Sequence, residues 1–458
     1  MGRKRVIYNP YRSVDFENYR MVKWDYHIHM RGFNNEPAGI FDAMVGEDAS
    51  IGTNNSTDSL KDRERVDETY DAFGLTTNNP ADEDIYWAEA DTEQGYNYFS
   101  DDDSVSYSDD RDAESFEVIE FPSSEWKDVE HVVGFFNKSR DGDITQNNRS
   151  QVVEDIIKSD KDKVVIDGQE SENDNSLAII AHPGRYTSLD NVVSEYSEFS
   201  DFQITDGLVG VEVINKGWVW KEVDPSRTAA HDLSRDEEVE IFDRLCYEHA
   251  PERPIWAFAA NDCNDGTLGW DFDQRFNVAL IPEKDFKPGN QGSTRRVLKN
   301  AIEKGRTLAF QRIPWDSDGE NERDFSNDWP SDWDNEDTPW RVPKVNNVKI
   351  ENRKAVVDIE DYNSVEWRSK GGVLVDTGLE CDLNNEDIED YLRAHIYRNG
   401  DSEDENDVED VADTMIQPLM IDERNNFENC KTETESKNGV VAKKISRNHS
   451  QSQTKVVV

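Results

Sequence analysis

Two histidines one residue apart, His27 and His29, are the first candidates for chemistry in a chain with only eight histidines among 458 residues. They lie in the string Asp25-Tyr-His-Ile-His29. In an extended strand, residues i and i+2 point to the same side, so both imidazoles could reach one metal ion at about 2.0–2.1 Å. Two solvent-facing histidines at a strand end would give the same pattern, so further ligands decide between the two interpretations.

Further candidate ligands follow apolar segments. His182 comes directly after Leu177-Ala-Ile-Ile-Ala181, and Asp262 comes soon after the run 255–260. Short apolar runs of this kind are typical of buried strands. Barrels of alternating strands and helices place their sites where strands end. The sequence therefore predicts that these side chains share one pocket with the histidine pair.

The order of the motifs resembles that of the PHP (polymerase and histidinol phosphatase) superfamily of metal-dependent phosphoesterases. The D-x-H-x-H motif of that family is matched by Asp25, His27 and His29. The other matches are Glu125 in a context similar to P-G-x-E, His131 at the start of an apolar strand, His182 in an A-H-P motif and Asp262 in place of the aspartate of S-D-x-H. The resemblance covers residues 24–310 and implies an α/β fold, a distorted seven-stranded β/α barrel.

The resemblance also implies a two-metal centre that hydrolyses a phosphate ester, with Glu125 and Asp262 among the catalytic groups. Oxygen and nitrogen ligands suit zinc, manganese or iron, and the sequence does not choose among them. The implied ligands are His27, His29, Glu125 and Asp262 for the first ion, and Glu125, His131 and His182 for the second.

A further catalytic candidate is Arg185, three residues after His182. A guanidinium at this place could hold a phosphate group through two parallel hydrogen bonds. An ordinary surface-loop arginine is the alternative interpretation.

Two departures from the family pattern concern its third metal. Thr76-Thr-Asn78-Asn79 stands where the family carries T-D-H-N, and Asn264 replaces the last histidine of S-D-x-H. In three-metal members these two histidines serve the same ion, so the resemblance implies that the third site is lost. The alternative is a catalytically degenerate protein with a binding or structural role, for example as a virion component.

Composition indicates the environment of the protein. Acidic residues number 99 against 51 basic ones, which gives a net charge of −48 spread along the chain. Self-repulsion of this size opposes compaction unless salt screens it, as in halophiles. We therefore expect a protein of a haloarchaeon or of its virus. The charge argues against unassisted binding to nucleic acid, whose phosphates call for Lys and Arg.

No apolar run approaches the roughly 20 residues of a membrane span. We expect no membrane partner and take a cytoplasmic location as the default, with a virion location left open. The expected partners are a phosphate-ester substrate and a protein bound through the C-terminal β region.

The pattern of hydrophobic residues divides the chain into five parts. Helices are expected at 151–157, 234–249 and 293–304 within the barrel, and short β-like runs follow residue 341. The parts are an N-terminal arm (1–23), the metal-binding barrel (24–310, with an acidic insertion at about 91–115), an acidic Trp-containing linker (311–340), a small sandwich-like β domain (341–422) and a polar tail expected to be flexible (423–458).

The charge leads to a prediction about salt. The screening distance grows from about 3 Å at 1 M salt to about 30 Å at 0.01 M, so repulsion among the excess carboxylates should rise as salt is removed. We expect the melting temperature, followed by circular dichroism, to fall steadily with decreasing KCl. A melting temperature that stays level or rises at low salt would contradict the halophile interpretation.

Overall fold

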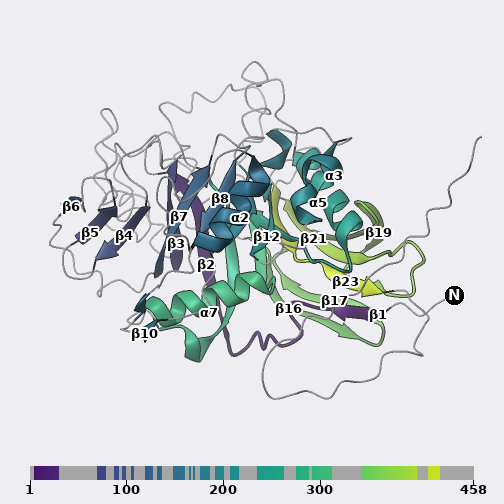
Figure 1. Ribbon diagram of the computed structural model, residues 1–458. Helices are drawn as coiled ribbons and strands as arrows, with labels where there is room; N and C mark the ends of the chain where they lie inside the picture. Colours follow the sequence, from purple (N-terminus) through teal and green to yellow (C-terminus); the bar gives the residue numbers. More distant parts are fainter. Residues whose placement is uncertain are drawn as a thin grey trace, which may run out of the picture.

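The computed structural model describes a mixed α/β protein made mostly of strands, with few helices (Figure 1). The residues described are 5–29, 70–78, 87–91, 95–99, 105–107, 119–126, 131–136, 148–159, 165–166, 169–170, 176–185, 191–200, 207–215, 235–262, 275–287, 291–311, 342–399 and 411–422. The predicted α/β class is confirmed at this level. None of the described helices is both long and apolar enough to cross a membrane.

One large curled sheet organises the described residues, and its strands are hydrogen-bonded along a single path. In sheet order they are β1 (Arg5–Tyr8), β23 (Leu419–Asp422), β21 (Tyr391–Asn399), β22 (Val411–Ile416), β15 (Thr307–Gln311), β14 (Arg275–Pro282), β2 (Tyr19–His29), β3 (Ala72–Asn78), β7 (Ile119–Trp126), β8 (Val132–Phe135), β11 (Leu177–Ile180), β12 (Leu208–Ile214) and β13 (Trp256–Ala259). Off this path, β18 (Ser364–Ser369) pairs with β21, and β19 (Val373–Thr377) pairs with β18.

The direction of the strands in the middle of this sheet decides where polar groups can gather. Strands β2, β3 and β7 are parallel, and so are β11, β12 and β13. Strand β8 lies between the two groups and is antiparallel to both β7 and β11. The carboxyl ends of the six parallel strands and the amino end of β8 therefore lie at the same edge of the sheet.

Helices cover these strands as their amphipathic patterns predict. Helix α2 (Arg149–Ser159) packs against β8 and β11, α5 (Arg235–His249) against β12, and α7 (Gln291–Glu303) against β14 and β7 (Figure 1). The predicted apolar faces of α2 and α5 are buried in the main core. The three helices expected from the sequence are thus confirmed.

Strand β13 is the last strand of the path, and its outer edge is hydrogen-bonded by side-chain amides instead of by another of the described strands. Gln417 accepts a hydrogen bond from the Ala257 N–H at 2.8 Å and donates one to its carbonyl at 2.7 Å. Asn277 of β14 does the same for Ala259, at 2.9 and 2.7 Å. Because buried backbone groups must be paired, these two amides allow β13 to be buried against β14. The sheet therefore curls back on itself as a partial barrel.

The C-terminal strands continue this sheet instead of standing apart from it. Strand β22 pairs with β15, and β23 pairs with β1 from the predicted N-terminal arm. Strand β14 is buried on both faces: Ala279 and Ile281 belong to the main core, whereas Phe276 and Val278 belong to a second core shared with the C-terminal strands. The predicted domain borders at 23 and 341 are therefore crossed by both hydrogen bonds and packing.

Smaller elements lie around the main sheet. A three-stranded sheet overlaps the predicted acidic insertion, and another lies in the C-terminal region, at the opposite side of the molecule in Figure 1. The first contains β4 (Trp87–Asp91), β5 (Gly95–Phe99) and β6 (Val105–Tyr107), and the second contains β16 (Lys344–Glu351), β17 (Lys354–Glu360) and β20 (Glu380–Asp382). The short pieces are β9 (Val165–Ile166), β10 (Gln169–Glu170), α3 (Val192–Glu195) and the 3-10 turns η6 (Pro183–Arg185), η7 (Ser197–Phe199) and η9 (Glu283–Asp285). Almost all of the predicted linker and the predicted tail lie outside the described residues.

A buried ion pair fastens the C-terminal strands to α5. The Arg393 guanidinium of β21 donates two hydrogen bonds of 2.6 Å to the two carboxylate oxygens of Asp243, and Tyr391 Oη donates another at 2.9 Å. Both charged side chains are almost fully shielded from solvent. Burial alone would lower the pKa of Arg393, but the Asp243 carboxylate more than offsets this effect and leaves it raised.

This pair gives a stability prediction. Arg393→Ala leaves the Asp243 carboxylate buried without its counter-charge, which should cost about 3–5 kcal/mol of unfolding free energy. Denaturant unfolding in molar salt measures it. The matched control is Lys344→Ala, which removes the exposed ion pair to Glu360 and should leave stability unchanged. Equal effects of the two substitutions would show that the buried pair does not hold the two regions together.

Candidate metal centre

The polar edge of the sheet collects five of the six predicted ligands. His27 lies near the end of β2, Glu125 near the end of β7, and His182 and Asp262 just beyond β11 and β13. His131 immediately precedes β8, whose reversed direction brings its first residue to the same edge. His29 is the last residue of β2, and its side chain lies outside the described part of the chain.

Glu125 lies at the centre of this group. Its Oε1 is 3.6 Å from His27 Nε2 and 3.6 Å from His182 Nε2, and it accepts a hydrogen bond from His131 Nδ1. The ligand atoms of Glu125, His131 and His182 all lie within 4.8 Å of one another. Asp262 Oδ1 is 3.5 Å from His27 Nε2 on the other side.

These distances fit a shared cation. Two ligands of one tetrahedral ion, with bonds of about 2.0–2.2 Å, lie roughly 3.3–3.6 Å apart. The separations of 3.5–3.6 Å around His27 and His182 fall in this range and exceed ordinary hydrogen-bond lengths. The buried cluster of Glu125, His131 and His182 could therefore hold a metal ion.

Electrostatics in the pocket favours a positive charge at the Nε2 atom of His27. Burial lowers the pKa of this imidazole, but the carboxylates of Glu212, Asp262 and Glu125 together raise it well above its ordinary value. A buried group between several carboxylates either keeps a proton or gives its place to a cation. In either case a positive charge inside the pocket must balance the buried carboxylates.

Glu212 fixes the orientation of two ligands at once. Its Oε1 accepts hydrogen bonds from Tyr26 Oη at 2.9 Å and from His27 Nδ1 at 2.7 Å. Its Oε2 accepts from the His182 N–H at 3.0 Å and from Asn215 Nδ2 at 2.7 Å. Donation through Nδ1 directs Nε2 of His27 toward Glu125 and Asp262, an arrangement that metal-bound histidines commonly use. Glu212 thus orients His27 and the backbone of His182, and Asn215 in turn holds Glu212.

A bulge in β2 explains why Tyr26 also reaches Glu212. The pairing of β2 with β3 changes register between Asp25 and Ile28. Strict alternation would send Tyr26 and His27 to opposite faces, whereas a bulge re-aims one of them. Sequence reasoning from regular alternation missed Tyr26 for this reason, and no local pattern in the chain marks the bulge.

Asp25 of the D-x-H-x-H motif holds the backbone around the pocket. Its Oδ1 accepts from the N–H groups of Tyr26 and His27, and its Oδ2 accepts from the backbone and side-chain nitrogens of Asn261. Burial raises the pKa of Asp25 to about 6, although these hydrogen bonds and the charge of His27 act to lower it. Asp25 therefore ties the end of β2 to the residues that follow β13.

Three of the proposed ligands have backbone angles in the left-handed region. The φ values are 51° at His131, 27° at His182 and 47° at Asp262. Non-glycine residues avoid this region, and where they occupy it the surroundings must compensate a cost of order 1–3 kcal/mol. Such strain often lies at functional sites, and three of the nine non-glycine residues with positive φ in the described part of the chain are proposed ligands.

The other predicted positions are only partly described. Arg185 ends the turn η6 after His182, and its side chain lies outside the described residues, as does Asn264. Asn78 is the last residue of β3, and in the ladder with β7 it lies directly opposite Glu125. The position at which the family resemblance places a third-site histidine is therefore next to Glu125 in the sheet.

Comparison of the chain with known protein families, curated proteins and solved structures finds no match.

The four hydrogen bonds to Glu212 lead to a prediction about metal affinity. Glu212→Gln replaces one carboxylate oxygen by an NH₂ group, which would face two donors and disturb either His27 or the backbone of His182. We expect zinc or manganese affinity, measured by calorimetric titration in molar salt, to fall about 10–100-fold. Tyr26→Phe removes a single donor and should have a smaller effect. Unchanged affinity in a folded Glu212→Gln protein would show that Glu212 does not support the ligands.

Proposed function

We propose that this protein is a metal-dependent phosphoesterase with a two-metal centre, built on a distorted seven-stranded barrel of the PHP type. The observation that carries the proposal is the convergence of His27, His131 and His182 on Glu125, with Asp262 at 3.5 Å from His27 on the same edge of the sheet. The order of the motifs and the strained backbone at three of these residues support it.

Glu125 is proposed to bridge the two ions. Its Oε1 lies at 3.6 Å from one histidine of each proposed site, His27 and His182. The first ion would take His27, His29, Glu125 and Asp262, and the second would take Glu125, His131 and His182. Zinc, manganese and iron all suit these nitrogen and oxygen donors.

Two divalent cations here would supply Lewis-acid chemistry, lowering the pKa of water and neutralising charge on a phosphoryl group. The chain itself positions the donors. Glu212 fixes the tautomer of His27, Asp25 holds the strand end, and burial of the cluster excludes bulk water from its inner side. Arg185 is proposed to hold a phosphate oxygen of the substrate.

One observation favours a second candidate, a PHP-like protein that binds without catalysis. Asn78 replaces a family histidine at a position that pairs with Glu125 in the sheet. The amide of Asn78 cannot replace the imidazole that binds a third ion in three-metal members of the family. A binding or structural role, for example in a virion, would keep the two-metal cluster as a structural element.

A test of the proposal starts from Glu125→Gln, which keeps the size of the side chain but removes the bridging charge. We expect loss of bound metal, measured by plasma mass spectrometry, together with loss of hydrolysis of an aryl phosphate monoester and diester. Assays contain manganese or zinc in molar salt. The matched control is Glu198→Gln, a buried glutamate that is paired with Arg149 and is not a proposed ligand, which should retain both metal and activity.

The outcomes separate the two candidates. Activity in the wild type that disappears only in Glu125→Gln supports the phosphoesterase. An inactive wild type that gains activity in the double variant Asn78→His/Asn264→His identifies a decayed enzyme and favours the binding protein. Equal activity of the wild type and Glu125→Gln would exclude this centre as the catalyst.

A further inference from the structure

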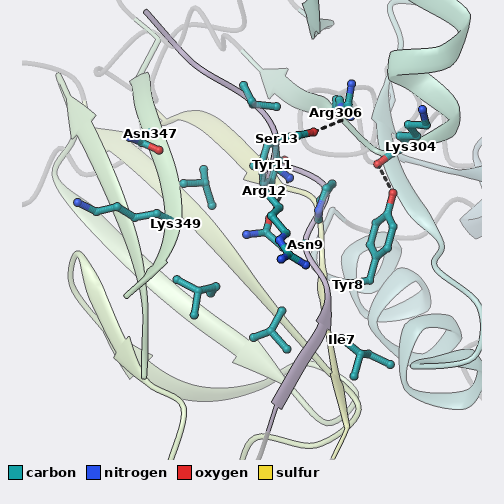
Figure 2. A pocket seen from close by; sticks show the side chains of 15 residues that line it. Ile7, Tyr8, Asn9, Tyr11, Arg12, Ser13, Lys304, Arg306, Asn347 and Lys349 are labelled. Atoms are coloured by element: carbon teal, nitrogen blue, oxygen red, sulfur yellow. Dashed lines mark hydrogen bonds between the residues drawn. The ribbon is translucent and has the colours of Figure 1, made fainter. Parts of the chain in front are cut away.

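A groove of about 980 Å³ lies between the N-terminal segment and the C-terminal three-stranded sheet (Figure 2). Its walls are the continuous run 6–14, the continuous run 347–350 of β16, and Lys304 and Arg306 beyond α7. The residues that line it, and the strands that carry them, are different from those of the metal centre.

The groove is basic in a very acidic protein. Its lining includes Arg12, Lys304, Arg306 and Lys349, and none of the described residues that line it is an aspartate or glutamate. The chain as a whole has 99 acidic and 51 basic residues, so four basic residues without an acidic one run against its composition. A concave surface lined by one sign of charge attracts ligands of the opposite sign. The ligand of this groove should therefore be an anion.

Two strand edges border the groove. Strand β1 is hydrogen-bonded only to β23, and β16 only to β17, within the part of the chain that the structure describes. Successive side chains of a strand point to opposite faces. The lining residues within each strand are consecutive, 6–8 in β1 and 347–350 in β16, so the groove follows the edges of these strands, where N–H and C=O groups are offered to a further strand.

The lining along β16 also alternates in polarity. Val348 is buried in the second core and Ile350 packs against it, whereas Asn347 and Lys349 point away from that core. Lys349 forms an ion pair of 3.2 Å with Glu351, but both side chains are about half exposed, and such pairs contribute little. A carboxylate of a bound ligand can therefore compete with Glu351 for the ammonium group of Lys349.

The opposite wall is already held in place. Arg306 donates to Ser13 Oγ at 2.7 Å, Tyr8 Oη donates to the Lys304 carbonyl at 2.8 Å, and Tyr11 Oη donates to the Thr307 carbonyl at 2.8 Å. Figure 2 shows the first two of these contacts at the rim of the groove. A wall fixed before binding loses little conformational freedom when a ligand arrives.

We propose that this groove binds an extended acidic peptide segment of a partner protein, which adds as a strand to the edge of β16. Main-chain hydrogen bonds would supply affinity, and alternate side chains would supply specificity. Acidic side chains face Lys349 and Arg12, and apolar side chains face Ile350 and the exposed Ile7. A peptide is favoured over a nucleic acid because the strand edges offer partners for backbone amides, which a phosphate backbone lacks.

The net charge of −48 does not prevent this binding in concentrated salt. At 1 M the screening distance is only about 3 Å, so long-range repulsion vanishes and contacts within the groove decide. The inference does not depend on the metal centre or its chemistry.

The test uses the full chain in molar KCl and a fluorescent peptide of alternating aspartate and valine, as long as the eight residues of β16. Fluorescence anisotropy should show saturable binding. The double variant Arg12→Glu/Lys349→Glu should bind at least about tenfold more weakly, which corresponds to about 1.4 kcal/mol. The variant Lys284→Glu/Lys287→Glu makes the same charge change at exposed residues outside the groove and should bind like the wild type.

Two further probes test the mode of binding. A peptide N-methylated at alternate residues keeps its charge but cannot form the strand ladder, and it should bind much more weakly. A peptide of alternating lysine and valine should not bind. Equal binding to the wild type and to the groove variant, equal binding of the methylated peptide, or preference for single-stranded DNA over the aspartate peptide would each overturn the proposal.

Discussion

The burial of several ionisable side chains at one edge of the sheet is the constraint on which the rest of the structure depends. His27, Glu125, His182, Glu212 and Asp262 are almost completely withdrawn from solvent. Carboxylates are costly to bury unless they are paired or hydrogen-bonded, so each of them needs a donor or a cation nearby. Hydrogen bonds from Tyr26, Asn215 and the backbone of His182 meet this need for Glu212. The carboxylates around His27 need a proton or a metal ion.

The architecture of the sheet places these groups together at one edge. Parallel strands bring their carboxyl ends to one edge, and the reversal of β8 adds His131 to that edge. The amides of Asn277 and Gln417 close the open side of the curl against β13. The C-terminal strands cover the outer face of β14 and form the second core. The pocket is therefore supported on both sides by packed strands.

The sequence allowed the prediction of the elements that carry a local signal. The apolar runs before His182 and Asp262 predicted strands that end at polar residues, and the helical spacing in α2 and α5 predicted their buried faces. The structure differs from the sequence-based expectation where the geometry of a segment depends on residues far away in the chain. The direction of β8, the bulge at Tyr26 and the four donors of Glu212 follow from pairing between segments far apart in the chain.

The same limit applies to the division into domains. The turn-rich pattern after residue 341 indicated a small β domain, and local composition carries no sign that β22 pairs with β15. Hydrogen-bonding capacity at a strand edge is the same whether the partner is near or far in sequence. The buried ion pair between Asp243 and Arg393 is equally hidden from local patterns, since each residue alone resembles a surface charge.

The pairing of β1 with β23 and the contact of Gln417 with β13 have a consequence for how the protein is made. Arg5 lies opposite Asp422, and Ala257 receives its hydrogen bonds from a residue 160 positions later. During translation, the ribosome must therefore release nearly all of the described chain before the sheet can be completed. Until then the edges of β13 and β15 remain open to pairing with other nascent chains, since unpaired edges attract further strands.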